Sequence, residues 1–537
     1  MVEFFIIAKG YSFELFEHIG IGYIKSYLKR NGVDSNINLI LPNEKEELYN
    51  ILENKKPLVV GFVVYSFNAL EIKEASRIVK MCLPNTHITV GGPATLNCTK
   101  EILDMLPDVD SVIEGEGEYT FLELVNLIKQ EKELSGCQGL TFRKGKEIVI
   151  NSSRPLINNL DSLPFPARDI FEKYPSSYIR IIGSRGCSGH CTFCVYGGAA
   201  AKGIQKGERV RFRSAVNIVD EMEELVEKYG VRSFYFIDDT FIEEKYVKGI
   251  EKVEGIIEEV TRRKLDITFA IQTRPQSIAR NEKVREYIKR LQKIGLNYVF
   301  IGLDTGNNDD MRIYGKNTTI QDNIRAVQFL QEQNVHLSFG FIMFNPYSSI
   351  EKILQNANFL YENHLGYSIY SYLTQLEVYP TSTFRSMLIK DGLMDKNAKF
   401  SDILAYKFLD KRIEKLTHLF RNLSEDFEAN HLMENIGILK TKIINHQKNG
   451  NENLCEKELK EINDIYEYYN QVNYQLFCNC VKLISSDNVS AIEFLLKQYK
   501  ETYTVKMEKL KVIYKRAYVK YLRLEHSIKG NFNGKNV

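Results

Sequence analysis

Three cysteine residues stand close together in one glycine-containing segment of the chain. Cys187, Cys191 and Cys194 follow the spacing C-x3-C-x2-C, and the apolar, strand-like run Tyr178–Ile182 lies just before them. Thiolates held this closely on one loop can converge on a metal centre. Three thiolates leave one iron of a four-iron cluster without a protein ligand, and a chelating substrate needs such an open iron. The spacing therefore predicts an iron–sulfur site with one open position.

A structural zinc site is the alternative for the same cysteines. Such a site normally takes four protein ligands, usually from two C-x2-C pairs. His190 is a candidate for the fourth ligand, but it adjoins Cys191 and would have difficulty turning inward with it. The spacing and the setting fit an iron–sulfur cluster better.

The composition is that of a soluble globular protein with two or three domains. The chain has 537 residues, of which 44% are hydrophobic and 26% charged, and its net charge is +2. This balance points neither to nucleic acid nor to an anionic membrane. We expect no secretory signal and no membrane span. Nine cysteines, three of them in one loop, do not suggest a disulfide scaffold, so a reducing cytoplasm is expected.

Residues 1–145 alternate short apolar runs with amphipathic stretches. Continuous Val/Ile runs separated by helical periods are typical of a parallel sheet covered on both faces, so we expect a doubly wound, flavodoxin-like domain. Ligands of such folds bind beyond the carboxyl ends of the strands, where glycines let the backbone approach a large flat molecule. The glycines in these positions are Gly20, Gly22, Gly91, Gly92, Gly115 and Gly117.

A proline-containing connector over residues 146–176 precedes a second alternating region, residues 177–390. Six strands with crossover helices suit a partial (β/α)6 barrel, whose chemistry lies at the C-terminal strand ends. Polar residues occur there, although each could instead cap a helix or pair locally. The strand candidates are Ile179–Ile182, Ser233–Ile237, Ile267–Ile271, Tyr298–Leu303, Leu337–Met343 and Thr374–Val378.

Residues 391–537 lose the strand pattern and become rich in Lys, Glu, Leu and Tyr at helical spacing, which predicts an all-α third domain. Cys455, Cys478 and Cys480 lie in this region. Their scattered spacing is more typical of ordinary thiols than of a second cluster.

The cysteine loop, with the aromatic Phe193 before its last cysteine, resembles the cluster loop of radical S-adenosylmethionine (SAM) enzymes. Three further segments, Glu17–Tyr23, Val90–Thr95 and Gly115–Thr120, resemble successive signatures of the subgroup that carries an N-terminal cobalamin-binding domain. From the pattern alone, an ordinary nucleotide-binding fold would be favoured for the first domain. The resemblance covers about residues 1–390 and favours cobalamin.

The resemblance implies three cofactors: a 4Fe-4S cluster on Cys187, Cys191 and Cys194, SAM, and cobalamin. An Arg can hold the SAM carboxylate, an Asp can accept from a hydroxyl or ammonium group, and strand backbone can meet the adenine. The residues expected at SAM are Phe193, Asp238, Gln272, Arg274, Asp304, Gly340 and Ile342. The residues expected at cobalamin are Gly20, Gly22, Ser66, Phe67, Asn68, Gly91, Gly92, Gly115, Glu116 and Gly117.

The sequence departs from the family pattern at several points. Asp304 stands where many members have Glu, and the segment after Met343 lacks the usual G-F-P-G-E. A D-x-H-x-x-G motif, whose His ligates cobalt in other cobalamin proteins, is absent, and we interpret His18 as a loop or cap residue.

The function implied by the resemblance is C-methylation. A 5′-deoxyadenosyl radical would abstract hydrogen from an unactivated carbon of a small molecule or peptide, and methylcobalamin would donate the methyl group. A low-potential donor of the flavodoxin or ferredoxin type would supply electrons, and no catalytic residue beyond the cluster ligands is assigned. Two alternatives stay open: a ring rearrangement or cyclisation without methyl transfer, and a corrinoid-binding protein without catalysis.

Overall fold

The structure is a computed structural model that describes residues 1–8, 17–42, 44–176, 178–197, 207–423, 427–448 and 455–533. The internal contacts divide the chain into two compact units. Unit 1 comprises Met1–Ile267, Tyr314–Lys316 and Glu377–Tyr406, and unit 2 comprises Thr268–Ile313, Asn317–Leu376 and Lys407–Val537.

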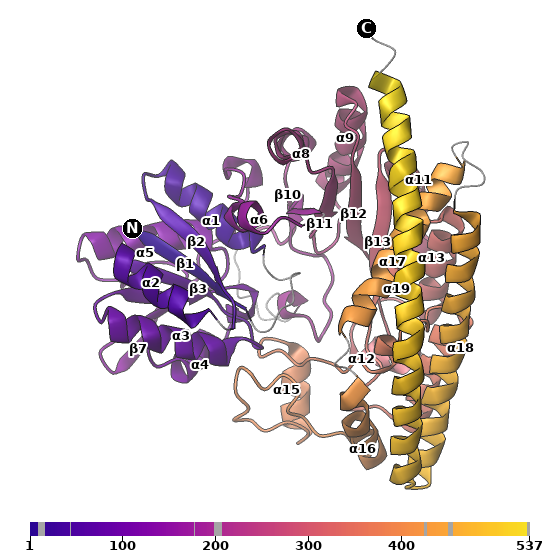
Figure 1. The fold of residues 1–537 in the computed structure, drawn as a ribbon. Coiled ribbons are helices and arrows are strands. Elements are labelled where there is room, and N and C mark those ends of the chain that lie inside the picture. The colour runs from indigo at the N-terminus through magenta and orange to yellow at the C-terminus, as the bar shows by residue number, and fades with distance from the viewer. Residues whose placement is uncertain are drawn as a thin grey trace. The chain divides into compact units, whose positions relative to one another are not determined.

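Unit 1 begins with a seven-stranded sheet of order β2-β1-β3-β4-β5-β6-β7 (Figure 1). The strands from β1 to β5 are parallel, whereas β6 and β7 form an antiparallel hairpin at one edge. The sheet thus continues to Ile150, past the predicted boundary at residue 145. Its strands are β1 (Val2–Ile7), β2 (Ser35–Ile40), β3 (Val59–Val63), β4 (His87–Gly91), β5 (Ser111–Ile113), β6 (Leu140–Lys144) and β7 (Glu147–Ile150).

Helices cover both faces of this sheet. Successive residues of a strand point to opposite faces, so alternate residues pack into different cores. Phe5 of β1 packs in one core with Leu52 and Ile72, whereas its neighbour Phe4 packs in the other with Leu28 and Phe121. The predicted doubly wound fold is therefore confirmed. The helices are α1 (Ile19–Arg30), α2 (Lys45–Lys55), α3 (Ala69–Cys82), α4 (Thr99–Met105) and α5 (Gly117–Lys129), with a 3-10 turn, η2, at Pro93–Thr95.

The predicted connector is an ordered strap. Its residues Ile157, Leu160 and Leu163 pack with Ile19 and Tyr23 of α1 in one small core. The strap contains the turn η3 (Leu160–Ser162) and the short helix α6 (Asp169–Lys173).

The remainder of unit 1 carries the start of the second α/β region. Strand β8 (Ile179–Ile181) pairs in parallel with β11 (Ser233–Phe236), and β9 (Ser184–Arg185) pairs antiparallel with β10 (Arg211–Phe212). The helices of this part are α8 (Ala215–Tyr229), α9 (Val247–Arg263) and α15 (Thr383–Lys390).

Unit 2 contains three parallel strands, β12 (Thr268–Thr273), β13 (Leu296–Asp304) and β14 (His336–Phe341). The expected sixth strand, Thr374–Val378, is reduced to one bridge between Phe344 and Gln375. The helices between and after these strands are α10 (Pro275–Arg280), α11 (Glu282–Lys293), α12 (Asn308–Ile313), α13 (Ile320–Gln333), α14 (Ile350–Glu362) and the turn η4 (Ile369–Tyr372).

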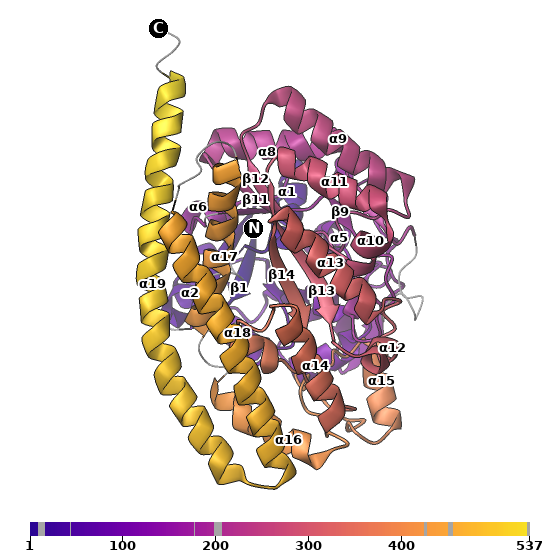
Figure 2. The same ribbon diagram turned by 90° about the vertical axis from the view of Figure 1, so that its right-hand side faces the viewer.

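The C-terminal part of unit 2 is helical, as the sequence predicts. It comprises α16 (Lys411–Phe420), the turn η5 (Arg421–Leu423), α17 (Phe427–Lys448), α18 (Glu456–Ser485) and α19 (Val489–Asn533). Helices α18 and α19 lie side by side in opposite directions (Figure 2), α17 contacts β13 and β14, and α18 contacts α14. In the described part of the chain, no helix combines the length and apolar character that a membrane crossing requires.

Candidate active site

The three cysteines of the predicted cluster lie on the loop after β9. All three are free thiols and are half-buried. Gly189 stands between two of them, because a Cβ atom there would lie 3.3 Å from Cys187 Sγ and 3.9 Å from Cys191 Sγ. The Gly189 amide donates to Cys187 Sγ at 3.2 Å, and the Thr240 hydroxyl lies 3.4 Å from the same sulfur. The loop therefore offers three sulfur ligands together with a backbone N–H donor that can stabilise sulfur charge.

The two metal predictions place different demands on these thiols. Among the residues that the structure describes, no three His, Cys, Asp or Glu side chains form a group that could hold a single metal ion. A zinc ion draws all its ligands to within about 2.3 Å of one point. A four-iron cluster binds each thiolate through a different iron, so the three sulfurs stand farther apart. The preference for the cluster rests on the spacing, which puts three ligands on one loop.

Hydrogen bonds of backbone and side chains hold the cysteine loop from two sides. The Ser188 amide and hydroxyl donate to the Glu243 carboxylate at 3.0 and 2.9 Å. The Thr192 amide donates to the Tyr314 carbonyl at 2.9 Å, and the Phe384 amide donates to the Thr192 carbonyl at 2.9 Å. Sequence reasoning missed Glu243, Tyr314 and Phe384, because nothing in their local patterns marks contacts with so distant a loop.

Phe193, expected at SAM, packs edge-on against Tyr314 with ring centroids 5.3 Å apart. This contact gives the Phe193 ring a packing role within the loop. Its expected contact with SAM stays a prediction.

Asp238, whose expected contact with SAM stays a prediction, is held by three hydrogen-bond partners. Its side chain is fully buried, and its carboxylate accepts from the Gly183 amide at 2.6 Å, the Ser184 hydroxyl at 2.6 Å and Lys252 Nζ at 2.8 Å. These partners give Asp238 a positioning role for the strand that leads into the cysteine loop. The adjacent Asp239 accepts from the Gly186 backbone, and burial, followed by the charge of Asp238, raises the pKa of Asp239 to about 6.

The carboxyl ends of β3, β4 and β5 contain a buried polar atom that fits a ligand. Ser66 Oγ is buried and has no hydrogen-bond partner in the described part of the chain. Gly92 has φ +135°, and a Cβ atom there would lie 2.9 Å from the Val64 carbonyl oxygen. A bare backbone beside an unsatisfied buried hydroxyl suits a large polar cofactor with amide side chains, as cobalamin is.

Asn68, Gly22 and Gly117, all predicted at cobalamin, make contacts within the domain. Asn68 accepts from the Tyr65 amide at 2.8 Å and donates to the Val63 carbonyl at 3.2 Å, which closes the turn after β3. A Cβ atom at Gly22 would lie 2.6 Å from the Ala167 carbonyl oxygen, and one at Gly117 would lie 2.8 Å from Ile24. These residues shape the domain.

The other residues predicted at cobalamin differ in exposure. Phe67 is exposed and stacks on Tyr65 with ring centroids 5.0 Å apart, whereas a Cβ atom at Gly20 would meet nothing within 4 Å. Gly91 ends β4, and Gly115, with φ +82°, follows β5.

Unit 2 gathers five predicted SAM residues at one edge of its strands. The register pairs Gln272 of β12 with Phe300 and Gly302 of β13 with Gly340 of β14, so the carboxyl ends of the three strands meet at one edge. Arg274 comes directly after β12, Asp304 ends β13 and Ile342 follows β14. The strand ends thus bring these residues to one edge, as the sequence predicts.

Asp304 adopts a strained backbone conformation. Its φ is +62°, and the Thr305 amide donates to the Leu303 carbonyl at 2.8 Å across it, which makes Asp304 the central residue of a γ-turn. The Asp304 carbonyl accepts from the Ile342 amide at 2.8 Å, and Asp304 Oδ1 lies 4.0 Å from the Cβ position of Gly340. Strain of this kind is concentrated at functional sites.

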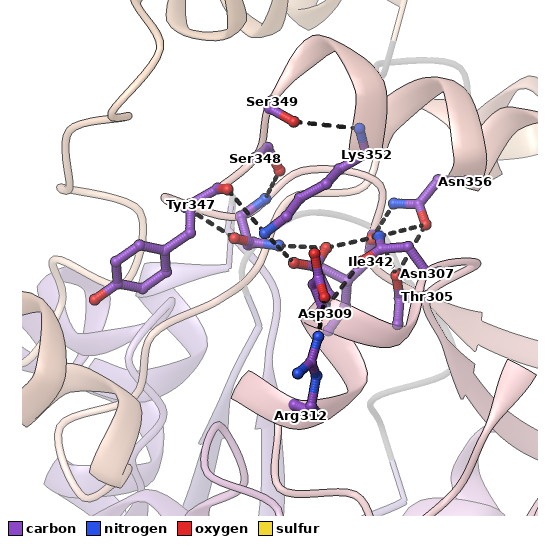
Figure 3. Close-up of polar contacts among 12 residues, drawn as sticks. Thr305, Asn307, Asp309, Arg312, Ile342, Tyr347, Ser348, Ser349, Lys352 and Asn356 are labelled. Atoms are coloured by element: carbon purple, nitrogen blue, oxygen red, sulfur yellow. Dashed lines mark hydrogen bonds and ion pairs between the residues drawn. The ribbon is translucent and has the colours of Figure 1, made fainter.

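A buried polar network holds the loops that follow β13 and β14 (Figure 3). Asp310, which is fully buried, accepts from Lys352 Nζ at 3.0 Å, Asn345 Nδ2 at 2.9 Å and Asn307 Nδ2 at 3.0 Å. Asn356 Oδ1 accepts from the Thr305 hydroxyl at 2.8 Å, next to Asp304. Sequence reasoning missed this network, although Asn and Asp after strands are a signal for it.

Comparisons with known proteins agree with the two predicted domains. The model of the Radical SAM superfamily matches residues 181–360, and that of the B12 binding domain matches residues 12–125. The matched domains imply a 4Fe-4S cluster, SAM and cobalamin, which are the three predicted cofactors.

Two curated relatives show how far the similarity extends. An uncharacterized methyltransferase of Pyrococcus horikoshii is 26% identical over 65% of this chain and 73% of its own length. The 4'-phospho-dehydrooxetanocin synthase of Priestia megaterium is 23% identical over 64% of this chain and 48% of its own length. The chain therefore spans about half the length of the second relative.

A solved structure has a similar fold over the whole chain. The cobalamin-dependent SAM radical enzyme OxsB, with aqua-cobalamin and SAM bound, superposes with a TM-score of 0.69 at 18% identity, covering 100% of this chain and 81% of that one. The cysteine loop, the doubly wound first domain and these comparisons agree, and the chain belongs to the radical SAM enzymes that carry a B12-binding domain.

Proposed function

We propose that this protein is a methyltransferase that acts on an unactivated carbon of a small molecule or peptide. One observation carries the proposal: the three-cysteine loop and the B12-binding domain belong to the same compact unit. When bound, the cluster and SAM supply a radical that removes hydrogen from the substrate, and cobalamin supplies the methyl group.

In this proposal the residues of the chain bind the cofactors, orient them and shield them from water. Cys187, Cys191 and Cys194 hold the cluster, and the amide of Gly189 stabilises charge on the first of these sulfurs. Among the residues at the strand ends of unit 2, we assign Arg274 to the SAM carboxylate, because a guanidinium holds a carboxylate with two parallel bonds. We assign Asp304 to an ammonium or hydroxyl group of SAM.

Electrons reach the cluster from a low-potential donor of the flavodoxin or ferredoxin type, and the reducing cytoplasm is the compartment that suits free thiols and such donors. In this proposal the protein acts neither on nucleic acid nor at an anionic membrane. The near-neutral net charge of +2 supports this choice.

Product mass after reaction with SAM labelled by a deuterated methyl group tests the proposal. A methyltransferase incorporates the labelled methyl group into the product. Formation of 5′-deoxyadenosine with an unlabelled, rearranged product would replace methyl transfer by the second candidate, cyclisation or ring rearrangement. A relative from Rubrivivax gelatinosus, 26% identical over 60% of this chain and 58% of its own length, is named a cyclase, which supports that candidate. Failure to form 5′-deoxyadenosine in reconstituted protein would identify a corrinoid-binding protein without catalysis.

A further inference from the structure

The turn between β5 and α5 is joined to the strand before the cysteine loop by a group of four charged side chains. Arg185 of β9 donates from Nη1 to Glu116 Oε1 at 2.9 Å and from Nη2 to Glu118 Oε1 at 2.6 Å. Arg211 of β10 donates to both oxygens of Glu116 at 2.8 Å. Glu118 is only 4% exposed in its side chain, so the pairs are shielded from water.

The charges of this group balance only when all four side chains are in place. Arg185 and Arg211 face each other across the β9–β10 pair, and two adjacent cations would repel without the carboxylate between them. Burial alone would raise the pKa of Glu116, but the two arginines outweigh it and hold that pKa below its usual value. The Ile157 amide of the strap also donates to Glu116 Oε2 at 2.6 Å. The turn, the strap and the two strands are thus tied at one point.

A tight backbone joins this group to the first cluster ligand. Gly186 alone separates Arg185 from Cys187, and its φ is +89°. A Cβ atom at Gly186 would lie 2.0 Å from the Arg209 carbonyl oxygen, so the backbone is confined there. A displacement of Arg185 therefore moves Cys187. Arg185 also lies over the Tyr23 ring of α1, 5.2 Å from its centroid.

We propose that Arg185 is a positioning residue that couples the two cofactor sites: binding of cobalamin beside the Gly115–Gly117 turn and binding of SAM at the cluster on Cys187 strengthen each other through the Arg185–Glu116–Glu118 bridge. The inference rests on the proposed function only in taking both cofactors to bind. Coupling of two sites is reciprocal, so each ligand changes the affinity for the other by the same factor.

The test uses the full chain with its cluster reconstituted. The dissociation constant of hydroxocobalamin is measured by absorbance titration with and without saturating SAM, and that of SAM with and without hydroxocobalamin. We expect both ratios to be equal and at least about 5-fold, in the range usual for coupled sites. Arg185→Lys keeps the charge but cannot hold two carboxylates in one fork, so its ratios should fall toward 1. The electron paramagnetic resonance spectrum of its reduced cluster should also stop responding to cobalamin.

Two further variants keep the test decisive. Arg154→Lys is the matched control, because Arg154 pairs with Glu123 of the same helix α5 and makes no described contact with the cysteine loop; it should keep the wild-type ratios. Glu118→Gln keeps the side-chain shape but removes the charge that pairs with Arg185, so its ratios should also fall toward 1; it carries the test if Arg185→Lys does not fold.

The outcomes separate this inference from the proposed function. Ratios of 1 in the wild type, or wild-type ratios in both bridge variants, would overturn the coupling even if the labelled methyl group is transferred. Two equal affinity ratios in the wild type that fall to 1 in the bridge variants would support the coupling even if the product carries no label.

Discussion

Lys252 Nζ lies 2.8 Å from the carboxylate of Asp238, and side-chain exposure is 1% for the lysine and 0% for the aspartate. The ammonium group also lies 4.1 Å from the centroid of the Phe241 ring. The same carboxylate accepts from Gly183 and Ser184, at the entrance to the cysteine loop. A buried ion pair thus anchors the strand that presents the three cluster ligands.

Replacement of Lys252 by Met should destabilise unit 1 strongly. The change leaves the Asp238 carboxylate buried without its cation, which typically costs about 3–5 kcal/mol in the free energy of unfolding. Lys228→Met is the matched control, because the pair of Lys228 with Glu172 is exposed on both sides; its cost should stay below about 1 kcal/mol. Urea unfolding curves measure both. Equal costs would contradict the role given to Lys252.

Removal of one cluster ligand should abolish the chemistry of the cluster but leave cobalamin binding intact. Cys191→Ala should abolish formation of 5′-deoxyadenosine, because a cluster with two thiolates is not held, while the B12-binding domain still folds and binds hydroxocobalamin. The control is Cys82→Ala, since Cys82 lies at the end of α3 and away from the loop. Chromatographic assay of 5′-deoxyadenosine and the iron content measure the effect. Full activity in Cys191→Ala would remove that residue from the ligand set.

The two properties of Asp304, its charge and its positive φ, can be tested separately. Asn and Gly both tolerate the left-handed region, so Asp304→Asn and Asp304→Gly should fold normally. Both lose the carboxylate, and loss of a hydrogen bond to a charged group costs about 1.5–3 kcal/mol, which weakens SAM binding by about 10- to 100-fold. Calorimetric titration of SAM into the reconstituted protein measures this change. An unchanged dissociation constant in both variants would assign Asp304 to the turn alone.

Stability should fall in acid because of His336. This side chain is buried at the start of β14, where burial, and then the charge of Lys440, lowers its pKa from 6.5 to about 3. In the unfolded chain His336 therefore binds a proton as the pH falls below about 6.5, whereas in the folded protein it stays neutral until about pH 3. Stability contributed by neutral His336 is present above pH 6.5 and is lost as the pH falls through this window, by up to about 1.4 kcal/mol per pH unit.

Replacement by a neutral side chain isolates this contribution. His336→Gln should show a flatter loss of unfolding free energy between pH 6.5 and 4 than the wild type. The exposed His364 offers a control, His364→Gln, with a wild-type slope. Denaturant unfolding at several pH values gives the slopes. A wild-type slope in His336→Gln would assign the acid sensitivity to other groups.

Local patterns were sufficient for much of the fold and for the cluster site, whereas cobalamin was predicted from the family resemblance. The C-x3-C-x2-C spacing is short enough that covalent geometry alone brings the thiols onto one loop. Alternating apolar runs and helical periods predicted both α/β regions, because burial of a parallel sheet requires that pattern at every strand. The strand predicted at Thr374–Val378 was wrong: this short alternating segment forms one bridge only, between Gln375 and Phe344.

The amino-acid sequence by itself determined the cysteine loop, the doubly wound first domain and most of the strand positions, and its family resemblance indicated the reaction class. Tertiary structure decided what the charged residues do. Asp238 is predicted from the sequence as a strand-end residue at SAM, and only the fold shows that Lys252, 14 positions away, pairs with it. Arg185 meets Glu118 across 67 positions. No local period encodes such pairs, because the free energy of a buried charge depends on which partner the completed fold brings to it.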